Sequence, residues 1–201
     1  MQIRPFRPTD TADMYDVCVR TADGGGDASG QYLTDDLMPD LFAGPYAWLE
    51  PEHAFVVDDG QRVVGYVVGT ADTARFVERY RAEWIPRLGD KYAVPGGEDS
   101  SPNATLLRLH FWPERMLSPE LEPYPAHLHI DLLPSAQRLG LGRQLIDTLL
   151  AVFAAEGVPA VHVGMVATNV EAGKFYDRLG FTELPVADVE GVTFLVRPTT
   201  G

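Results

Sequence analysis

The most regular pattern of hydrophobic and polar positions lies in the last third of the chain. Residues 126–133 alternate between the two kinds of side chain, which predicts a β-strand. One face of this strand carries His127, His129 and Asp131, whereas the other carries leucine and isoleucine. The elements predicted after it are a helix at 140–156, a strand at 160–166, a helix at 171–179, and strands at 181–184 and 192–196. Their order predicts an α/β fold in which crossover helices join parallel strands and an antiparallel pair ends the sheet.

The first half of the chain is predicted to contain shorter elements. They are a strand at 2–6, a helix at 11–20, a helix at 34–42 capped by Thr34, a hairpin with strands at 54–57 and 63–68, and a helix at 73–85. Pro45 and Pro51 mark the stretch before the hairpin as irregular. Prolines also interrupt residues 86–125, in which only 104–112 is predicted to be regular. We expect this stretch to form a covering or substrate-facing segment, because a long structureless loop is unusual inside a domain.

Composition narrows the classes of partner. The chain has 201 residues and is 45% hydrophobic, which fits a single domain spanning residues 1–201. Its 16 basic and 29 acidic side chains give a net charge of −13, which argues against a nucleic-acid partner. The acidity favours a cationic substrate weakly, and a well-solvated surface is the alternative explanation. Cys18 is the single cysteine and the first ten residues lack an apolar segment, so we expect a cytoplasmic protein without a membrane partner.

The loop between the polar-faced strand and the next helix is the most specific segment. A helix N-terminus offers unpaired N–H groups and partial positive charge, which together bind phosphate. Gly140 and Gly142 would let a ligand approach the backbone there, and Arg138 and Arg143 would add charge. A nicotinamide-binding fingerprint would need a third glycine where the chain has Leu145, so that class is excluded. Taken alone, the glycines are also compatible with a simple turn that starts a helix.

Two motifs in the expected order resemble the GNAT superfamily of N-acetyltransferases. The first, Gln137-x-x-Gly140-x-Gly142, resembles the acyl-CoA pyrophosphate loop of that superfamily. The second is Asn169-x-x-Ala172-x-x-Phe175-Tyr176-x-x-Leu179-Gly180-Phe181. The relatives it resembles within the superfamily are the acetyltransferase-like C-terminal domain of animal O-GlcNAcase and its bacterial counterparts. The resemblance implies a GNAT fold, with a mixed central sheet, helices on both faces and a splay between the fourth and fifth strands. It also implies that residues 73–125 are an insertion relative to a minimal member.

The function implied by this resemblance is transfer of an acetyl group from acetyl-CoA to a primary amine, by direct attack in a ternary complex. The residues that would bind the cofactor are Leu132, Leu133, Gln137, Arg138, Leu139, Gly140, Leu141, Gly142, Arg143, Asn169, Lys174 and Tyr176. Tyr176 would also protonate the departing thiolate, and a backbone N–H near Leu132 would stabilise the oxyanion. Each motif residue has a structural alternative: Tyr176 fits a core aromatic, and Thr168 with Glu171 would form a capping box beside Asn169.

The general base is left open among several side chains. His127, His129 and Asp131 share one strand face, and an ordinary histidine pKa near 6.5 suits proton abstraction. The alternatives are His110, Glu114 and His162, a base that acts through water, or histidines that serve only in packing. Three alternate positions on one strand are weak ligands without a fourth, so no metal is predicted.

The acceptor is expected to be a small amine or a basic peptide, and a homodimer is kept as an alternative assembly. The competing hypothesis for the whole chain is a CoA-binding or degenerate GNAT module that serves protein interaction.

Overall fold

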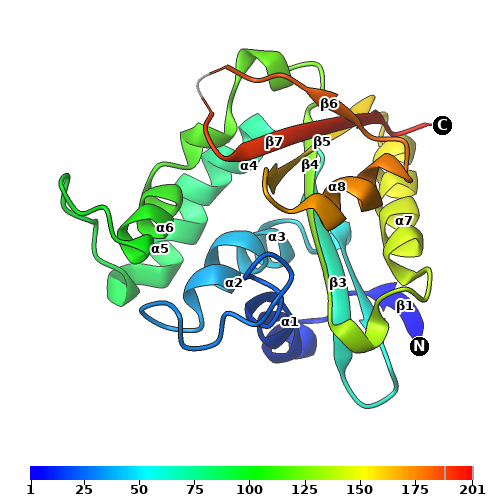
Figure 1. Ribbon diagram of the computed structural model, residues 1–201, viewed down its shortest axis with the longest axis horizontal. Helices are drawn as coiled ribbons and strands as arrows, with labels where there is room; N and C mark the ends of the chain where they lie inside the picture. The colour runs from blue at the N-terminus through cyan, green and yellow to red at the C-terminus, as the bar shows by residue number, and fades with distance from the viewer. Residues whose placement is uncertain (188, 201) are drawn as a thin grey trace.

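The computed structural model describes residues 1–187 and 189–200, and over these residues the chain forms a seven-stranded mixed β-sheet in the order β1-β2-β3-β4-β5-β7-β6 (Figure 1). The strands are β1 Gln2–Pro5, β2 Ala54–Asp58, β3 Val63–Thr70, β4 Ala126–Leu132, β5 Ala160–Val166, β6 Thr182–Leu184 and β7 Val192–Pro198. The strands predicted from the sequence are therefore confirmed, including the antiparallel pair β6–β7 at the end of the chain. The placement of β7 between β5 and β6 was not predicted.

The sheet opens between β4 and β5, the parallel neighbours. Their pairing covers Ala126 opposite Val161 and His127 opposite His162, and no further pairs follow within the described residues. Figure 1 shows β5 and β7 fanning away from β3 and β4. The backbone of β4 beyond His127 therefore has no strand neighbour on that side, which confirms the predicted splay.

Helices cover both faces of the sheet. They are α1 Thr11–Val19, α2 Leu37–Phe42, α3 Gly44–Leu49, α4 Thr73–Arg79, α5 Ile85–Leu88, α6 Pro102–Phe111, α7 Leu141–Ala155 and α8 Val170–Asp177. The helix α7 packs on one face, across β1 to β4, while α1 and α3 contact β3 on the other. Gly69 of β3 allows the close approach of both β4 and α7, because a Cβ there would lie 2.6 Å from the His127 carbonyl oxygen and 3.1 Å from Leu149. None of the described helices is long and apolar enough to cross a membrane.

The second predicted helix and the stretch after it are corrected by the structure. The helix α2 begins at Leu37 and has Asp36, not Thr34, at its N-cap. The stretch expected to be irregular contains α3, because Pro45 occupies the first helical turn, where its missing N–H costs no hydrogen bond. This helix buries Tyr46, so the correction matters for the site described below.

The proline-rich stretch after the hairpin contains more helix than its sequence suggested. The helix α4 continues through a π-helical turn, Tyr80–Trp84, into α5, and α6 follows and contacts α2. A buried carboxylate on α2 anchors this segment: Asp40 accepts hydrogen bonds from Lys91 at 2.7 Å and from the Tyr92 hydroxyl at 2.8 Å. The segment therefore covers α2 and is packed against it rather than forming a linker.

Candidate active site

The loop before α7 presents a run of free backbone donors. Among the described residues, the N–H groups of residues 138–143 have no hydrogen-bond acceptor, and the first helical bond is donated by Gln144 to the Gly140 carbonyl at 3.2 Å. Gly140 and Arg138 both have positive φ, of 79° and 61°. An arginine in the left-handed region of φ is strained. Backbone in which residues of positive φ alternate with residues of negative φ directs successive N–H groups toward one point. The loop therefore has backbone donors with which an anion could be bound.

Basic side chains gather around this loop although the chain as a whole is acidic. Arg143 donates to the Arg178 carbonyl at the end of α8, at 2.7 Å. Lys174 pairs with Glu171 at 2.7 Å, and this hydrogen bond lowers the pKa of the Glu171 carboxyl, with smaller contributions from Arg178 and Arg138. Arg138, Arg143 and Arg178 thus add positive charge near the loop, whereas the charge of Lys174 is balanced by Glu171.

The structure requires glycine at position 142 for a different reason from the one expected. It is buried, and a Cβ there would lie 3.0 Å from the Phe175 ring and 3.2 Å from Leu132. The position therefore needs glycine because α7 packs tightly against α8 and β4, rather than because a ligand must approach that Cα. Its N–H still belongs to the free run.

The open edge of β4 offers backbone groups to a ligand. Leu133 donates its N–H to the Val64 carbonyl of β3 at 2.9 Å, so that donor points away from the opening. Alternate residues of a strand direct their backbone groups to opposite neighbours, so Ile130 and Leu132 direct theirs into the opening. The Gln137 side chain occupies the Leu132 carbonyl at 2.8 Å. The Leu132 N–H is thus the better placed donor of the pair 132–133.

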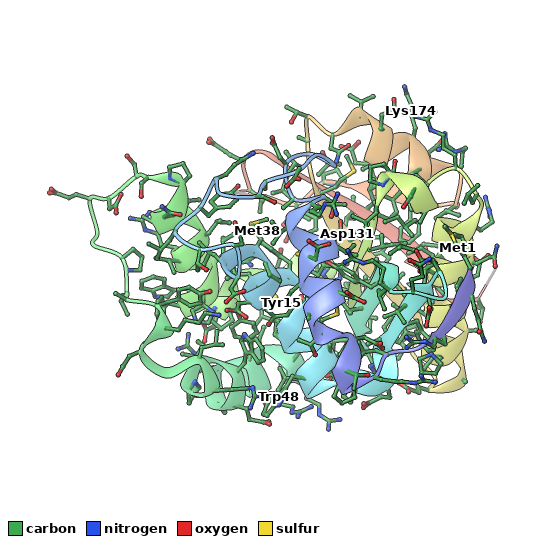
Figure 2. The ribbon with its side chains drawn as sticks, turned by 90° about the horizontal axis from the view of Figure 1, so that it is seen from below. Met1, Tyr15, Met38, Trp48, Asp131 and Lys174 are labelled. Atoms are coloured by element: carbon green, nitrogen blue, oxygen red, sulfur yellow. The ribbon has the colours of Figure 1, made fainter. Side chains whose placement is uncertain are left out.

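Asp131 belongs to the same strand, and the pKa of its side-chain carboxyl is shifted. It accepts a hydrogen bond of 2.5 Å from the Tyr66 hydroxyl, directly opposite in the β3–β4 register. Burial raises the pKa of Asp131 to about 6, although the Tyr66 hydrogen bond opposes the rise. Asp131 is half-buried, and Figure 2 labels it near the middle of the molecule in that view. The group is therefore mostly ionised at neutral pH but gains a proton readily.

Tyr176 lies close to Asp131. Burial raises the pKa of the Tyr176 hydroxyl, and the Asp131 charge raises it further. The ring packs against Phe175 and Phe181, which accounts for its helical spacing in the motif. The residue is buried, and within the described part of the chain its hydroxyl has no hydrogen-bond partner. Both interpretations of Tyr176 are compatible with this geometry, since the ring is in the core and the hydroxyl forms no hydrogen bond there.

The histidines of β4 belong to a hydrogen-bonded chain. Tyr46 of α3 places its hydroxyl 2.7 Å from Nε2 of His127 and 3.1 Å from Nε2 of His129. Thr73 of α4 places its hydroxyl 2.7 Å from Nδ1 of His127. Burial lowers the pKa of His129 to about 4, and it lowers the pKa of His127 well below its usual value. Both imidazoles are neutral at neutral pH.

The alternative bases lie in other surroundings. His110 is buried in contact with Tyr80, whose hydroxyl is 2.8 Å from its Nδ1, and Glu114 pairs with Arg81 at 2.5 Å. His162 lies on β5 beside His127, and its Nδ1 is bonded to the Tyr124 carbonyl at 2.7 Å. The structure therefore gathers His127, His129, Asp131 and His162 on one face and places His110 and Glu114 in the segment that covers α2.

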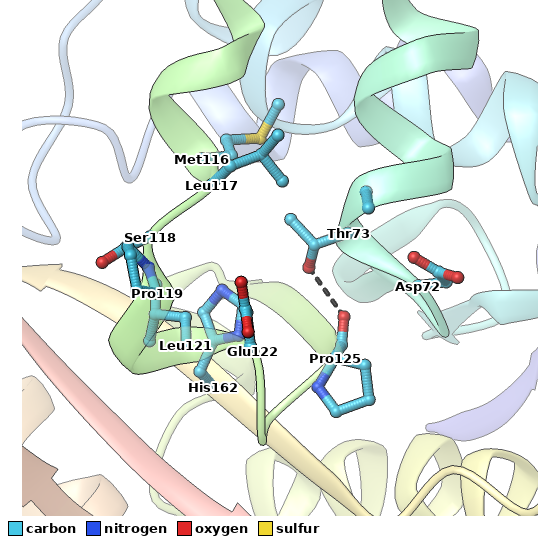
Figure 3. A pocket seen from close by; sticks show the side chains of 11 residues that line it. Asp72, Thr73, Met116, Leu117, Ser118, Pro119, Leu121, Glu122, Pro125 and His162 are labelled. Carbon is cyan, nitrogen blue, oxygen red and sulfur yellow. Dashed lines mark hydrogen bonds between the residues drawn. The ribbon is translucent and has the colours of Figure 1, made fainter.

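A pocket of about 370 Å³ adjoins His162 (Figure 3). The N-terminus of α4 forms one wall, at Asp72 and Thr73, and residues 116–122 form another. Figure 3 also shows the hydrogen bond from the Thr73 hydroxyl to the Pro125 carbonyl. The pocket thus lies on the sheet face that carries the histidines.

Asn169 caps α8, since its side chain accepts a hydrogen bond from the Ala172 N–H at 3.1 Å. The cap is therefore Asn169 itself and not the predicted pair of Thr168 and Glu171. Glu171 pairs with Lys174 instead, and both side chains are exposed. The amide nitrogen of Asn169 is not used by the cap.

Sequence reasoning missed three side chains of this face. Tyr46 fell in a stretch predicted to be irregular, and Thr73 was considered only as the start of a helix. Tyr66 belongs to the predicted hairpin, but its position opposite Asp131 depends on the β3–β4 register. A strand-pairing prediction would have found Tyr66, whereas the sequence held no comparable signal for the other two.

Comparison with known proteins agrees with this architecture. Residues 27–181 match the profile described as the acetyltransferase (GNAT) family. The chain is 28% identical over 191 residues to the protein O-GlcNAcase of Rattus norvegicus and to that of Mus musculus, covering 94% of this chain and 20% of each relative. It therefore spans about a fifth of the length of these curated relatives.

Solved structures extend the comparison. The crystal structure of SsHAT is 49% identical, with a TM-score of 0.95 and coverage of 100% of this chain and 98% of that one. An agmatine N-acetyltransferase, 18% identical with a TM-score of 0.58 and 98% coverage of both chains, shares the fold. The profile match and the open β4–β5 edge lead to one conclusion: the chain belongs to the acetyltransferase (GNAT) family.

Proposed function

We propose that this protein is an N-acetyltransferase that transfers an acetyl group from acetyl-CoA to a primary amine by direct attack in a ternary complex. The observation that carries the proposal is the unpaired edge of β4 beyond His127. This edge ends at the loop with the free N–H run and carries Asp131, with Tyr176 close by. One edge thus has an anion-binding group at its end and acid–base groups along it.

The loop fits a pyrophosphate. Acetyl-CoA, when bound, supplies an acetyl group activated as a thioester and carries several negative charges on phosphates. The N–H groups of residues 138–143 would bind the pyrophosphate, with Arg138 and Arg143 adding charge. A net charge of −13 repels such a ligand at long range, so binding depends on this local field. The side chains of Asn169 and Lys174 are candidates for contacts with the rest of the cofactor.

The face of β4 supplies the acid–base chemistry. Asp131 would accept the proton that the amine loses, since its pKa of about 6 leaves it ionised yet able to take up a proton near neutral pH. The N–H of Leu132 would stabilise the oxyanion as the amine nitrogen bonds to the acetyl carbon. Tyr176 would give its hydroxyl proton to the thiolate when the carbon–sulfur bond breaks.

Direct transfer is favoured over an acetylated enzyme. Cys18 is the only cysteine of the chain, and it is buried in the core. Burial raises the pKa of its thiol, so the thiolate needed for nucleophilic attack is suppressed.

Turnover on a panel of amines tests the proposal. We would measure CoA release from acetyl-CoA with spermidine, agmatine and a lysine-containing peptide, together with the binding heat of acetyl-CoA. Agmatine is included because a protein of the same fold is named for it. The proposal expects release that depends on at least one amine. Tight binding of acetyl-CoA with no amine-dependent release would instead favour a CoA-binding module that serves protein interaction.

A further inference from the structure

The hydrogen-bonded chain through His127 and His129 has one possible order of donors and acceptors. The Thr73 end of the chain determines it. The Thr73 hydroxyl lies 2.7 Å from the Pro125 carbonyl oxygen and 2.7 Å from Nδ1 of His127. A carbonyl oxygen can only accept a hydrogen bond, so the threonine hydroxyl must donate its single proton to it. The hydroxyl oxygen then accepts from His127, which places the proton of that imidazole on Nδ1.

The same reasoning continues along the chain. A neutral imidazole with its proton on Nδ1 has an acceptor at Nε2. Tyr46 therefore donates its hydroxyl proton to Nε2 of His127, 2.7 Å away. Its oxygen is left to accept from Nε2 of His129 at 3.1 Å. Every proton position in the chain follows from the Pro125 carbonyl, provided that both rings are neutral.

This series of hydrogen bonds leaves one hydrogen-bond acceptor unused. With its proton on Nε2, His129 has a lone pair on Nδ1. Within residues 1–187 and 189–200 that nitrogen has no hydrogen-bond partner, and it is not fully buried, since His129 is a half-buried residue. His127 differs, because both of its nitrogens are bonded and the ring is buried. Of the two, only His129 can contact a further molecule.

We propose that Thr73, His127 and Tyr46 hold His129 in the tautomer with its proton on Nε2, so that its Nδ1 accepts a hydrogen bond from the N–H of the acceptor amine. The inference rests on the proposed function, because it takes the amine to bind on this face. It makes His129 a substrate-binding residue and Thr73, His127 and Tyr46 positioning residues. His127, predicted as a candidate base, thereby acts through His129.

The hydrogen-bonded chain cannot carry a proton away from His129 through Thr73. Passing a proton from His129 through Tyr46 and His127 would bring it to Thr73, whose partner is a backbone carbonyl. A carbonyl oxygen cannot take up and pass on that proton, so the hydrogen bonds of Thr73 offer it no onward path. The hydrogen-bonded chain therefore orients the His129 ring. The proton of the amine must be taken up by another group, such as Asp131.

Nitrogen NMR of the five histidines tests the tautomer directly, without any substrate. Two-bond correlations between ring protons and ¹⁵N distinguish protonated from unprotonated nitrogens. We expect His127 protonated on Nδ1 and His129 on Nε2. Thr73→Val should reverse the donor and acceptor roles along the hydrogen-bonded chain. The His129 proton should then lie on Nδ1, although residue 73 does not touch His129. Thr73→Ser should restore the native pattern, and Tyr80→Phe, which removes a hydroxyl bonded to His110, should leave it unchanged.

The kinetic arm uses the best acceptor of the amine panel. Losing one hydrogen bond of about 1 kcal/mol predicts a rise in KM for the amine of about fivefold in Thr73→Val, with acetyl-CoA affinity unchanged and recovery in Thr73→Ser. A His129 proton on Nδ1 in the native protein overturns the inference, as does an unchanged tautomer in Thr73→Val or an unchanged amine KM once the tautomer has reversed. If no amine is acetylated, the proposed function fails, while the spectra still decide the tautomer.

Discussion

Gly142 of α7 lies so close to Phe175 of α8 that a Cβ at position 142 would be 3.0 Å from the phenylalanine ring. The two residues belong to the two motifs by which the sequence resembles its family. The motifs are therefore in contact, and the loop before α7 is held against the helix that carries Tyr176. Under the proposed function, acetyl-CoA binding and placement of the proposed acid would depend on the same packing.

We expect Gly142→Ala to destabilise the protein by about 1–3 kcal/mol, the usual cost of overpacking, and to weaken acetyl-CoA binding as the loop shifts. Denaturant unfolding and titration calorimetry measure the two effects. Phe175→Leu should recover much of both losses in the double variant. Gly173→Ala is the matched control, because a Cβ there meets only Met165 at 3.6 Å, and it should be tolerated. Full stability and affinity in Gly142→Ala would contradict the packing explanation.

Tyr176→Phe separates chemistry from packing. The hydroxyl has no partner among the described residues, so its loss should leave the melting temperature and the Kd for acetyl-CoA unchanged. Loss of a positioned acid should lower kcat by about 10²-fold or more. Single-turnover and steady-state rates measure this effect. Unchanged kcat would reduce Tyr176 to a core aromatic.

Asp131→Asn tests the proposed base through its pH dependence. Burial raises the pKa of Asp131 to about 6, so kcat/KM of the native enzyme should fall as the pH drops below that value, because the carboxylate becomes protonated. The variant should lose about 10²- to 10⁴-fold in kcat/KM, and this acidic limb should disappear. Asp177→Asn, on the exposed end of α8, is the control. An acidic limb that persists in Asp131→Asn would assign the base elsewhere.

A buried histidine away from the site gives a prediction about stability. His53 lies between Glu50 and Glu156, at 2.9 Å from each, and these hydrogen bonds raise its pKa although burial opposes the rise. The protonated ring therefore stabilises the fold at low pH, and the contribution is lost as the pH rises through the raised pKa.

Glu156→Gln should accordingly lower the free energy of unfolding more at pH 6 than at pH 9. The difference should be modest, on the order of 0.5 kcal/mol, because Glu156 is partly exposed. Urea unfolding at the two pH values measures it. Equal losses at both pH values would show that the charge on His53 is not involved.

The last third of the fold could be predicted because its periodicity is local. The strand at 126–133 and the helix at 140–156 are each defined by their own side chains, and β4 and α7 match them closely. The helix α3 was missed because Pro45 suggests a break, whereas its tolerance in a first turn depends on where the helix starts. The hydrogen-bonded chain through Tyr46 and Thr73 joins residues that are far apart in sequence, and no local pattern encodes such contacts.

Initial rates with both substrates varied test the central claim most directly. Direct attack in a ternary complex predicts that reciprocal plots of rate against acetyl-CoA concentration, at several fixed concentrations of the amine, intersect, and that the isolated protein gains no acetyl group from acetyl-CoA alone. Parallel lines, together with a 42-Da gain in protein mass at a side chain that later passes its acetyl group to the amine, would contradict the account.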